Sequence, residues 1–239
     1  MEETTDYLLV NKPAPLQIHP SKPADAGLTL WDGLRELLAF EIANGGQVSI
    51  INRLDRETSG LVLIAKNTPA ARMFSKAMMR RQVQKSYLAI VRGSPTWESI
   101  TCDRPILRAG DVTESAIWVR QMVHDQGAPC LSDFQVLKRW QNSDGGFALI
   151  EARPHTGRMH QLRVHLAHLG HPVVGDKIYN DDGSGYLEFL ETGWTPALQT
   201  RLLLPRQALH SHTLELETSQ GLRRWEAPLT ADLRHFMKS

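Results

Sequence analysis

An aspartate lies among arginines between two apolar segments, in the sequence Ile51-Asn-Arg-Leu-Asp-Arg-Glu-Thr-Ser-Gly60. The apolar residues on either side predict two strands, so Asp55 is expected in a turn that a rigid scaffold holds. Arg53 and Arg56 are close enough in sequence to keep a partly buried carboxylate ionised. Asp55 is therefore a candidate catalytic group, and a turn aspartate that bonds its own backbone is the structural alternative.

A second candidate segment, residues 153–171, contains five histidines and three arginines. Metal binding is one interpretation, and it makes a metal-dependent hydrolase an alternative function. The segment has no HExxH motif and no Cys or Glu to complete a site, so we predict no metal. Thr156-Gly157-Arg158 precedes a predicted helix and fits a phosphate-binding turn, because helix N-termini favour anions.

The charges are distributed unevenly although their sum is close to zero. The chain has 27 Lys and Arg and 26 Asp and Glu, a formal charge of +1. No acid occurs from Thr58 to Trp97 or from Ala152 to Gly175, and both stretches contain several arginines. Such a protein can present one basic face to a polyanion. The alternative is that these cations lie on ordinary solvated helix faces.

Composition and length exclude several classes of protein. With 239 residues, 41% hydrophobic and 22% charged, the chain is neither disordered nor fibrous. No apolar run reaches the roughly 18 residues that a membrane span requires. The acidic N-terminus is unlike a secretory signal. Cys102 and Cys130 have no metal-type spacing, so we expect two free thiols in a reducing, cytoplasmic environment.

The pattern of apolar residues predicts more strands than helices. Strands are predicted at residues 7–10, 48–51, 61–65, 87–91, 147–151 and 213–217. Helices are predicted from Thr29 (N-cap) to Asn44, from Thr68 (N-cap) to about Arg81, at 160–170 and at 230–237. In the second helix Met73, Ala77 and Met78 are expected on the apolar face. Because strands and helices do not alternate regularly, we predict an α+β fold in one domain over residues 1–239.

The first candidate segment resembles the catalytic motif of RluA-type RNA pseudouridine synthases. That motif usually runs His-Arg-Leu-Asp, two variable residues, Thr-Ser-Gly, an apolar strand and Ala-Lys, and here it extends from Asn52 to Lys66. Further blocks resemble the family in its order. They are Leu9 to Pro20, Lys85-Ser-Tyr87, His155 to Tyr179 and Arg206-Gln-Ala-Leu-His210.

The resemblance implies a pseudouridine synthase fold: a mixed, largely antiparallel, bent sheet with flanking helices and a central catalytic cleft. It implies an isomerase that converts uridine in ribosomal or transfer RNA to pseudouridine without a cofactor. Asp55 resembles the catalytic aspartate, as nucleophile at C1′ or as base at C2′. Tyr87 resembles the aromatic residue that stacks on the uracil. Arg163 resembles the arginine that pairs with the aspartate.

The resemblance also implies how RNA is bound. The target uridine must be flipped out of its stack, and Arg53 resembles the residue that fills the vacated space. The remaining predicted RNA-binding residues are Arg56, Thr58, Lys85, Arg158 and His160. We expect a monomer without a membrane partner, and the few residues before Tyr7 leave no room for the RNA-binding domain that some relatives carry.

The sequence departs from the family pattern at a few positions. Asn52 stands where His is usual, Ala14 where Gly is usual, Met159 where Thr or Ser is usual, and Asn180 where Gly often follows the tyrosine. None of these replaces the predicted catalytic residues, so they bear on the choice of substrate. A catalytically silent RNA-binding or chaperone module on the same scaffold is the alternative to an enzyme.

Overall fold

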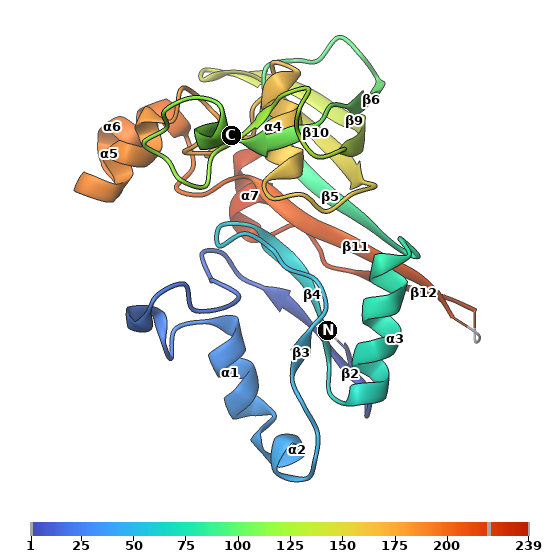
Figure 1. The fold of residues 1–239 in the computed structure, drawn as a ribbon. Helices are drawn as coiled ribbons and strands as arrows, with labels where there is room; N and C mark the ends of the chain where they lie inside the picture. Colours follow the sequence, from blue (N-terminus) through green and yellow to red (C-terminus); the bar gives the residue numbers. More distant parts are fainter. Residues whose placement is uncertain (1, 219–220, 239) are drawn as a thin grey trace. The chain divides into compact units, whose positions relative to one another are not determined.

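The computed structural model describes residues 2–218 and 221–238, which form two compact units (Figure 1). Unit 1 consists of Met1–Lys85 and His210–Thr230, and unit 2 consists of Ser86–Leu209 and Ala231–Ser239. The expectation of one catalytic domain over the whole chain stays a prediction.

Unit 1 is built on a sheet in which β4 lies between β2 and β11. Its strands are β1 (Glu2–Glu3), β2 (Tyr7–Lys12), β3 (Ser49–Ile50), β4 (Ser59–Ala65), β11 (Leu209–Thr218) and β12 (Gly221–Glu226). β2 and β4 pair antiparallel, whereas β11 pairs with β4 in parallel. All seven residues of β4 are buried, as its continuous apolar sequence predicts.

Three α-helices accompany this sheet: α1 (Leu30–Leu37), α2 (Ala39–Ala43) and α3 (Thr68–Met79). The predicted N-cap of α1 is confirmed, because the Thr29 hydroxyl accepts from the Asp32 backbone N–H and the two residues form a capping box. The prediction of one helix from Thr29 to Asn44 was wrong in its middle, because α1 ends at Leu37, with Leu38 as its C-cap, and α2 begins after it. The C-cap of α2 is Asn44, where we predicted the end.

Two details of α3 were predicted wrongly. Its N-cap is Asn67, whose side-chain oxygen accepts from the Ala70 backbone N–H, and Thr68 is the first helical residue. Met73 is 49% exposed, because the buried face is set by Ala70, Phe74 and Ala77. Phe74 is the largest of these residues, and its burial turns Met73 toward solvent.

Unit 2 contains the strand order β5-β10-β9-β6 and a separate pair, β7-β8. The strands are β5 (Val83–Arg92, whose first three residues belong to unit 1), β6 (Ser99–Asp103), β7 (Ile106–Arg108), β8 (Gln121–Val123), β9 (Leu131–Asn142) and β10 (Gly145–Pro154). Every pair is antiparallel. The helices are α4 (Gln161–His168), α5 (Ser184–Thr192), α6 (Pro196–Leu202) and α7 (Ala231–Phe236). Our sequence reading did not predict α5 or α6.

The predicted α+β class with a mixed, largely antiparallel sheet is confirmed. The core of unit 1 lies between α3 and the sheet, where Phe74 packs with residues of β2, β4 and β11 and with Trp225 of β12. Within residues 2–218 and 221–238, no helix is both long and apolar enough to cross a membrane.

Candidate active site

Asp55 lies in a tight turn between β3 and β4, as predicted. The backbone N–H of Thr58 donates to the carbonyl of Asp55 at 3.1 Å, which closes the turn. Asp55 is half-buried and Thr58 is buried, whereas Arg53 and Arg56 are exposed. Neither arginine forms an ion pair within the described residues. Both guanidinium groups therefore face solvent from the turn that carries Asp55.

Lys12 at the end of β2 holds this turn from one side. It has no exposed surface, and its ammonium donates to the carbonyls of Pro13, Leu16 and Arg56 at 3.0, 2.7 and 3.2 Å. The Leu16 backbone N–H also donates to the Arg56 carbonyl at 2.9 Å. Since Arg56 directly follows Asp55, the buried cation fixes the backbone beside the candidate catalytic carboxylate.

The start of β4 holds the turn from the other side. The Ser59 hydroxyl and His210 Nδ1 are 2.9 Å apart, and both residues are buried. Gly60 has φ +112°, and a Cβ there would lie 2.2 Å from the Ser211 carbonyl oxygen. A glycine is required for β4 and β11 to approach this closely. His210 of the late Arg-x-x-Leu-His block thus supports the Asp55 turn.

Asn52, which stands where His is usual in the family, forms two hydrogen bonds to the backbone of β4. Its side-chain amide donates to the Leu61 carbonyl at 3.0 Å, and its side-chain oxygen accepts from the Leu63 backbone N–H at 2.8 Å. The residue is buried. An amide satisfies a backbone donor and a backbone acceptor together, so Asn52 attaches the first residues of the turn to β4.

Tyr87 lies on β5 in unit 2, opposite Ala152 of β10. Its side chain is 9% exposed. Arg163 lies in the first turn of α4 and is 4% exposed. Both are buried residues on regular elements, as a preorganised site requires.

Arg163 forms a bidentate ion pair with Asp176, a residue we did not single out from the sequence. The two N–O distances are 2.6 and 2.8 Å, and Asp176 has no exposed surface. The carboxylate also accepts from the backbone N–H groups of Ile178 and Tyr179. Burial acts to raise the pKa of Asp176, but the Arg163 charge and these hydrogen bonds outweigh it and lower the pKa.

Tyr179 connects the same network to His160. The His160 Nδ1 and the Tyr179 hydroxyl are 2.8 Å apart, and the hydroxyl accepts from the Gln121 backbone N–H at 2.9 Å. The Arg163 guanidinium lies 4.9 Å from the centre of the Tyr179 ring. Arg163 is thus held by a carboxylate and by an aromatic ring from one short segment, residues 176–179.

The Gln161 side chain bonds to both ends of the Thr156-Gly157-Arg158 segment. The Gln161 side-chain oxygen accepts from the Thr156 hydroxyl at 2.8 Å and from the Arg158 backbone N–H at 3.0 Å. Its amide donates to the Leu131 carbonyl. The Arg158 guanidinium is exposed and its Nε donates to the Pro129 carbonyl. His160, with φ 56°, precedes α4 in a left-handed conformation.

The histidines of residues 153–171 bond to separate partners. His165 contacts the Ser132 hydroxyl and the Arg104 carbonyl, and His155 contacts the Asp133 carboxylate at 2.6 Å. Burial lowers the pKa of His165. In the part of the chain that the structure describes, no three His, Cys, Asp or Glu side chains are grouped to hold a metal ion.

The predicted site residues fall into two groups. Arg53, Asp55, Arg56 and Thr58 share one turn of unit 1, and Lys85 on β5 belongs to the same unit. Burial lowers the pKa of Lys85. Tyr87, Arg158, His160 and Arg163 belong to unit 2. The sequence analysis assigned no supporting role to Lys12, Asn52, Asp176, Tyr179 or His210. All five stand inside the recognised blocks, which was the available signal.

Comparisons with known proteins point to one family. The family model for RNA pseudouridylate synthase matches residues 6–168. Ribosomal large subunit pseudouridine synthase D of Pseudomonas aeruginosa is 35% identical over 96% of this chain and 68% of its own length. The protein of that name from Escherichia coli K12 is 31% identical over 97% of this chain and 67% of its own length.

Two solved human structures have the same fold. RNA Pseudouridylate Synthase Domain Containing 1 aligns over 95% of this chain and 81% of its own, with 27% identity and a TM-score of 0.70. RNA Pseudouridylate Synthase Domain Containing 4 aligns over 99% of this chain and 90% of its own, with a TM-score of 0.75. At 23% identity the second comparison concerns the fold alone.

Proposed function

Since the chain belongs to the RNA pseudouridylate synthase family and is an isomerase that converts uridine to pseudouridine in RNA, we propose that it modifies ribosomal RNA with Asp55 as its catalytic group. The observation that carries the assignment of Asp55 is the turn that holds it. Lys12, Asn52 and His210 attach the backbone before and after Asp55 to neighbouring segments. A carboxylate on a backbone fixed at both ends suits chemistry at one defined atom.

The reaction replaces one bond between the uracil and the ribose with another. The N1–C1′ bond breaks, a C5–C1′ bond forms, the C5 proton is lost and N1 gains a proton, so no electrons enter or leave. Asp55 begins the reaction either by attack on C1′ or by removal of the C2′ proton. The detached base must stay bound while it turns, and a single ionised carboxylate serves a reaction that releases no product fragment.

Tyr87 and Arg163 are proposed to act on the same uridine as Asp55. A tyrosine ring stacked on the uracil lets the base turn in its own plane while it remains bound. Arg163, which Asp176 and the Tyr179 ring hold in one geometry, is proposed to supply the positive charge that favours the ionised form of the catalytic carboxylate. Arg53, exposed beside Asp55, is proposed to fill the space that the flipped nucleotide leaves. Arg56, Thr58, Lys85, Arg158 and His160 are proposed to contact the RNA, and the protein is proposed to act as a monomer.

Ribosomal RNA is proposed as the substrate because both bacterial relatives described above are named ribosomal large subunit pseudouridine synthase D. Pseudouridine mapping in RNA from cells with and without the gene tests this directly. We expect one or a few sites of the large-subunit RNA to lose pseudouridine in the deletion strain. Loss confined to transfer RNA would contradict the proposed substrate and leave the isomerase assignment intact.

Asp55→Asn tests the catalytic residue. The substitution keeps the shape of the side chain and removes its charge, so isomerisation should fall by more than about 1,000-fold while RNA affinity and folding stay nearly unchanged. Asp125→Asn is the matched control, because Asp125 is an exposed turn aspartate of unit 2. Residual turnover above one thousandth of the wild-type rate would show that Asp55 is not the essential group.

Two substitutions of Tyr87 separate its ring from its hydroxyl. Tyr87→Phe keeps the π-face and should bind RNA normally, whereas Tyr87→Ala should lose about 1–3 kcal/mol of stacking. A Phe variant with normal affinity and a very slow single-turnover rate would assign the hydroxyl to proton transfer. Wild-type turnover of the Ala variant would place Tyr87 in the core and outside the site.

A further inference from the structure

Helix α3 of unit 1 presents a row of cations to solvent. Its buried face consists of Ala70, Phe74 and Ala77, and the opposite side carries Arg72 and Lys76, with Arg80 as C-cap. All three cations are exposed. They are four residues apart, which places them on one side of the helix at steps of about 6 Å. We call Arg72, Lys76 and Arg80 the α3 ridge.

The α3 ridge is not neutralised by the protein. Within the described residues, none of its three side chains forms an ion pair or a hydrogen bond. Exposed arginines elsewhere do pair: Arg153 with Glu151 at 2.7 Å and Arg201 with Glu188 at 2.8 Å. The nearest acids in the sequence are Glu57 and Glu98, so no carboxylate of the local chain offsets these charges. Like charges four residues apart on a helix repel each other, which makes the arrangement costly unless an anion binds.

Arg81 adds a fourth cation at the end of the helix. It has φ 57°, a left-handed conformation in which glycine is the usual residue after a helix. An arginine pays a conformational cost there, and an observed outlier of this kind is a reason to look for a function. Arg81 is exposed and extends the positive surface beyond Arg80.

An open hollow borders the ridge at Arg72. Its wall includes Trp31, His19, Gln47, Thr68, Arg72 and Ser75, all from unit 1. The rings of His19 and Trp31 are 5.3 Å apart. Aromatic rings beside a row of cations are the combination that binds single-stranded nucleic acid, because bases stack on the rings and phosphates meet the cations.

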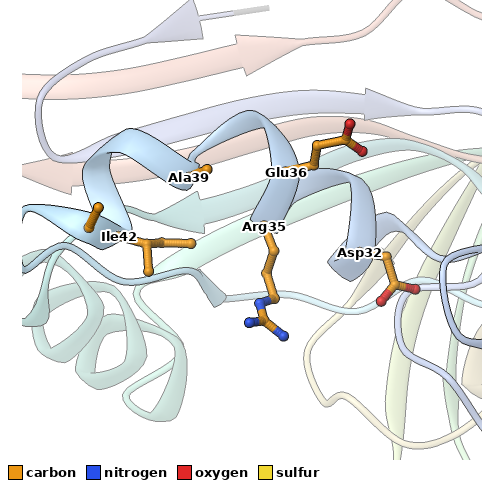
Figure 2. A pocket seen from close by; sticks show the side chains of 6 residues that line it. Asp32, Arg35, Glu36, Ala39 and Ile42 are labelled. Atoms are coloured by element: carbon orange, nitrogen blue, oxygen red, sulfur yellow. The ribbon is translucent and has the colours of Figure 1, made fainter.

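A second hollow of unit 1 differs from this one in charge. It is lined by Asp32, Arg35, Glu36, Ala39, Ile42 and Ala43 on α1 and α2, and Figure 2 shows Arg35 on the same short helix as both acids. The Asp32 and Glu36 carboxylates repel phosphate, and they offset the positive charge of Arg35. The two hollows therefore provide an internal comparison for the same unit.

We propose that the α3 ridge with the adjoining Trp31 hollow is an RNA-docking surface for a single-stranded segment outside the reacting nucleotide. The proposal rests on the proposed function in that the ligand is the RNA substrate. Phosphates bind at Arg72, Lys76, Arg80 and Arg81, and a base stacks against Trp31. An RNA strand fits better than an anionic membrane, because a membrane-binding helix needs a continuous exposed face of large apolar residues. On α3 Phe74 is buried, and the exposed Met73 and Met79 are six residues apart, so they lie on different sides of the helix.

The test compares two triple variants that remove the same charge. The first is Arg72→Ala/Lys76→Ala/Arg80→Ala, and the control is Lys22→Ala/Arg35→Ala/Arg234→Ala at exposed positions elsewhere. Binding of a fluorescein-labelled stem-loop with a single-stranded extension, taken from large-subunit RNA, is measured across a series of KCl concentrations. The ridge variant should bind roughly 10- to 100-fold more weakly, with a salt slope smaller by about 2, since each single-strand phosphate contact contributes about 0.7. The control should change affinity by less than about threefold.

Further readouts keep this result separate from catalysis. At saturating RNA the single-turnover rate of the ridge variant should stay within about twofold of wild type, because docking residues act on affinity. Trp31→Ala should weaken binding by about 5- to 150-fold without altering the salt slope, and Trp31→Phe should restore it.

Three outcomes would overturn the proposal. The two triple variants could bind the RNA with equal affinity and equal salt slope, or Trp31→Ala could bind it as tightly as wild type. The third is that the ridge substitutions weaken binding to phosphatidylglycerol vesicles and leave RNA binding unchanged. If the wild-type protein forms no pseudouridine, the proposed function fails, and the salt slopes still decide whether the ridge binds RNA.

Discussion

Helix α3 of unit 1 and helix α4 of unit 2 both lie in stretches without acids, yet their cations have opposite surroundings. On α3 the Arg72, Lys76 and Arg80 side chains are exposed and make no ion pair within the described residues. On α4 the Arg163 side chain is 4% exposed and bidentate with Asp176. A charge that is buried must have a partner, because desolvation otherwise costs several kcal/mol.

The difference indicates two uses of the same residue type. A buried arginine held by a carboxylate and a ring has one geometry, which suits the orientation of a reacting group. Exposed cations without partners have many geometries and attract phosphates by charge alone, so their effect is additive and sensitive to salt. Substitutions on the two helices should therefore differ in the sign of their effect on stability as well as in its size.

Arg163→Met is expected to have the largest effect. It leaves Asp176 buried without its cation, so the free energy of unfolding should fall by about 3–5 kcal/mol. Catalysis should fall by at least about 100-fold, as when a preorganised charged donor is removed. Urea denaturation and single-turnover kinetics measure the two effects.

A double variant shows whether stability and catalysis can be separated. Arg163→Met with Asp176→Leu replaces the ion pair by apolar groups of similar size, which is often neutral for stability. Stability should return toward wild type while activity stays low. If activity returned as well, Arg163 would have a purely structural role, and the contrast between the helices would concern folding alone.

Asp176→Asn is expected to have an intermediate effect on catalysis. The amide oxygen can still accept from the Ile178 and Tyr179 backbone N–H groups, but the Arg163 Nε–H loses its acceptor, the Asp176 Oδ2. The guanidinium can then turn, and a misplacement of about 1 Å costs roughly 100-fold in rate. The loss should appear in kcat with KM little changed. Asp232→Asn is the matched control, because Asp232 forms a second bidentate pair in unit 2, with Arg206.

The Asp55 turn could be predicted from the sequence because its determinants are local. A buried strand, a run of turn residues and a second buried strand are adjacent in the chain. The Thr29 cap was predictable for the same reason, since Asp32 follows it by three residues. Met73 was placed on the wrong face because Met73 and Phe74 are neighbours in the chain, and periodicity alone does not decide which of them faces the core. In the structure Phe74 is the buried residue.

The partner of Arg163 could not be predicted from local pattern. Asp176 follows it by 13 residues, and the segment between them must reverse direction to bring the two together. Gly175 permits this with φ +75°, where a Cβ would lie 2.0 Å from the Arg206 carbonyl oxygen. Helix α5 was missed for a related reason. The Lys177 ammonium lies 4.7 Å from the centre of the Phe189 ring on α5, and a tertiary contact of this kind leaves no periodic pattern in the sequence.

Two buried groups of unit 2, His165 and Asp176, should contribute to destabilisation of the protein by acid. The pKa of His165 is lowered by burial, so the unfolded chain binds a proton there first and stability falls below about pH 6.5. The pKa of Asp176 is also lowered, so its contribution is present above the unfolded value and is lost as pH falls below about 4. Unfolding free energies measured from pH 7 to pH 3 should decline in both intervals. His165→Gln should abolish the first decline, and persistence of that decline in the variant would assign it to another group.

Lys76→Ala is expected to have the smallest effect on stability, and an effect of opposite sign. Lys76 lies four residues from both Arg72 and Arg80, so its removal relieves two like-charge pairs of about 0.2–0.5 kcal/mol each. Alanine also has the higher helix propensity. The free energy of unfolding should rise by roughly 0.5 kcal/mol at low ionic strength, and the gain should shrink in 1 M KCl because salt screens the repulsion. A loss of stability at both salt concentrations would mean that Lys76 packs against the protein, and the ridge would then be structural like the Arg163 pair.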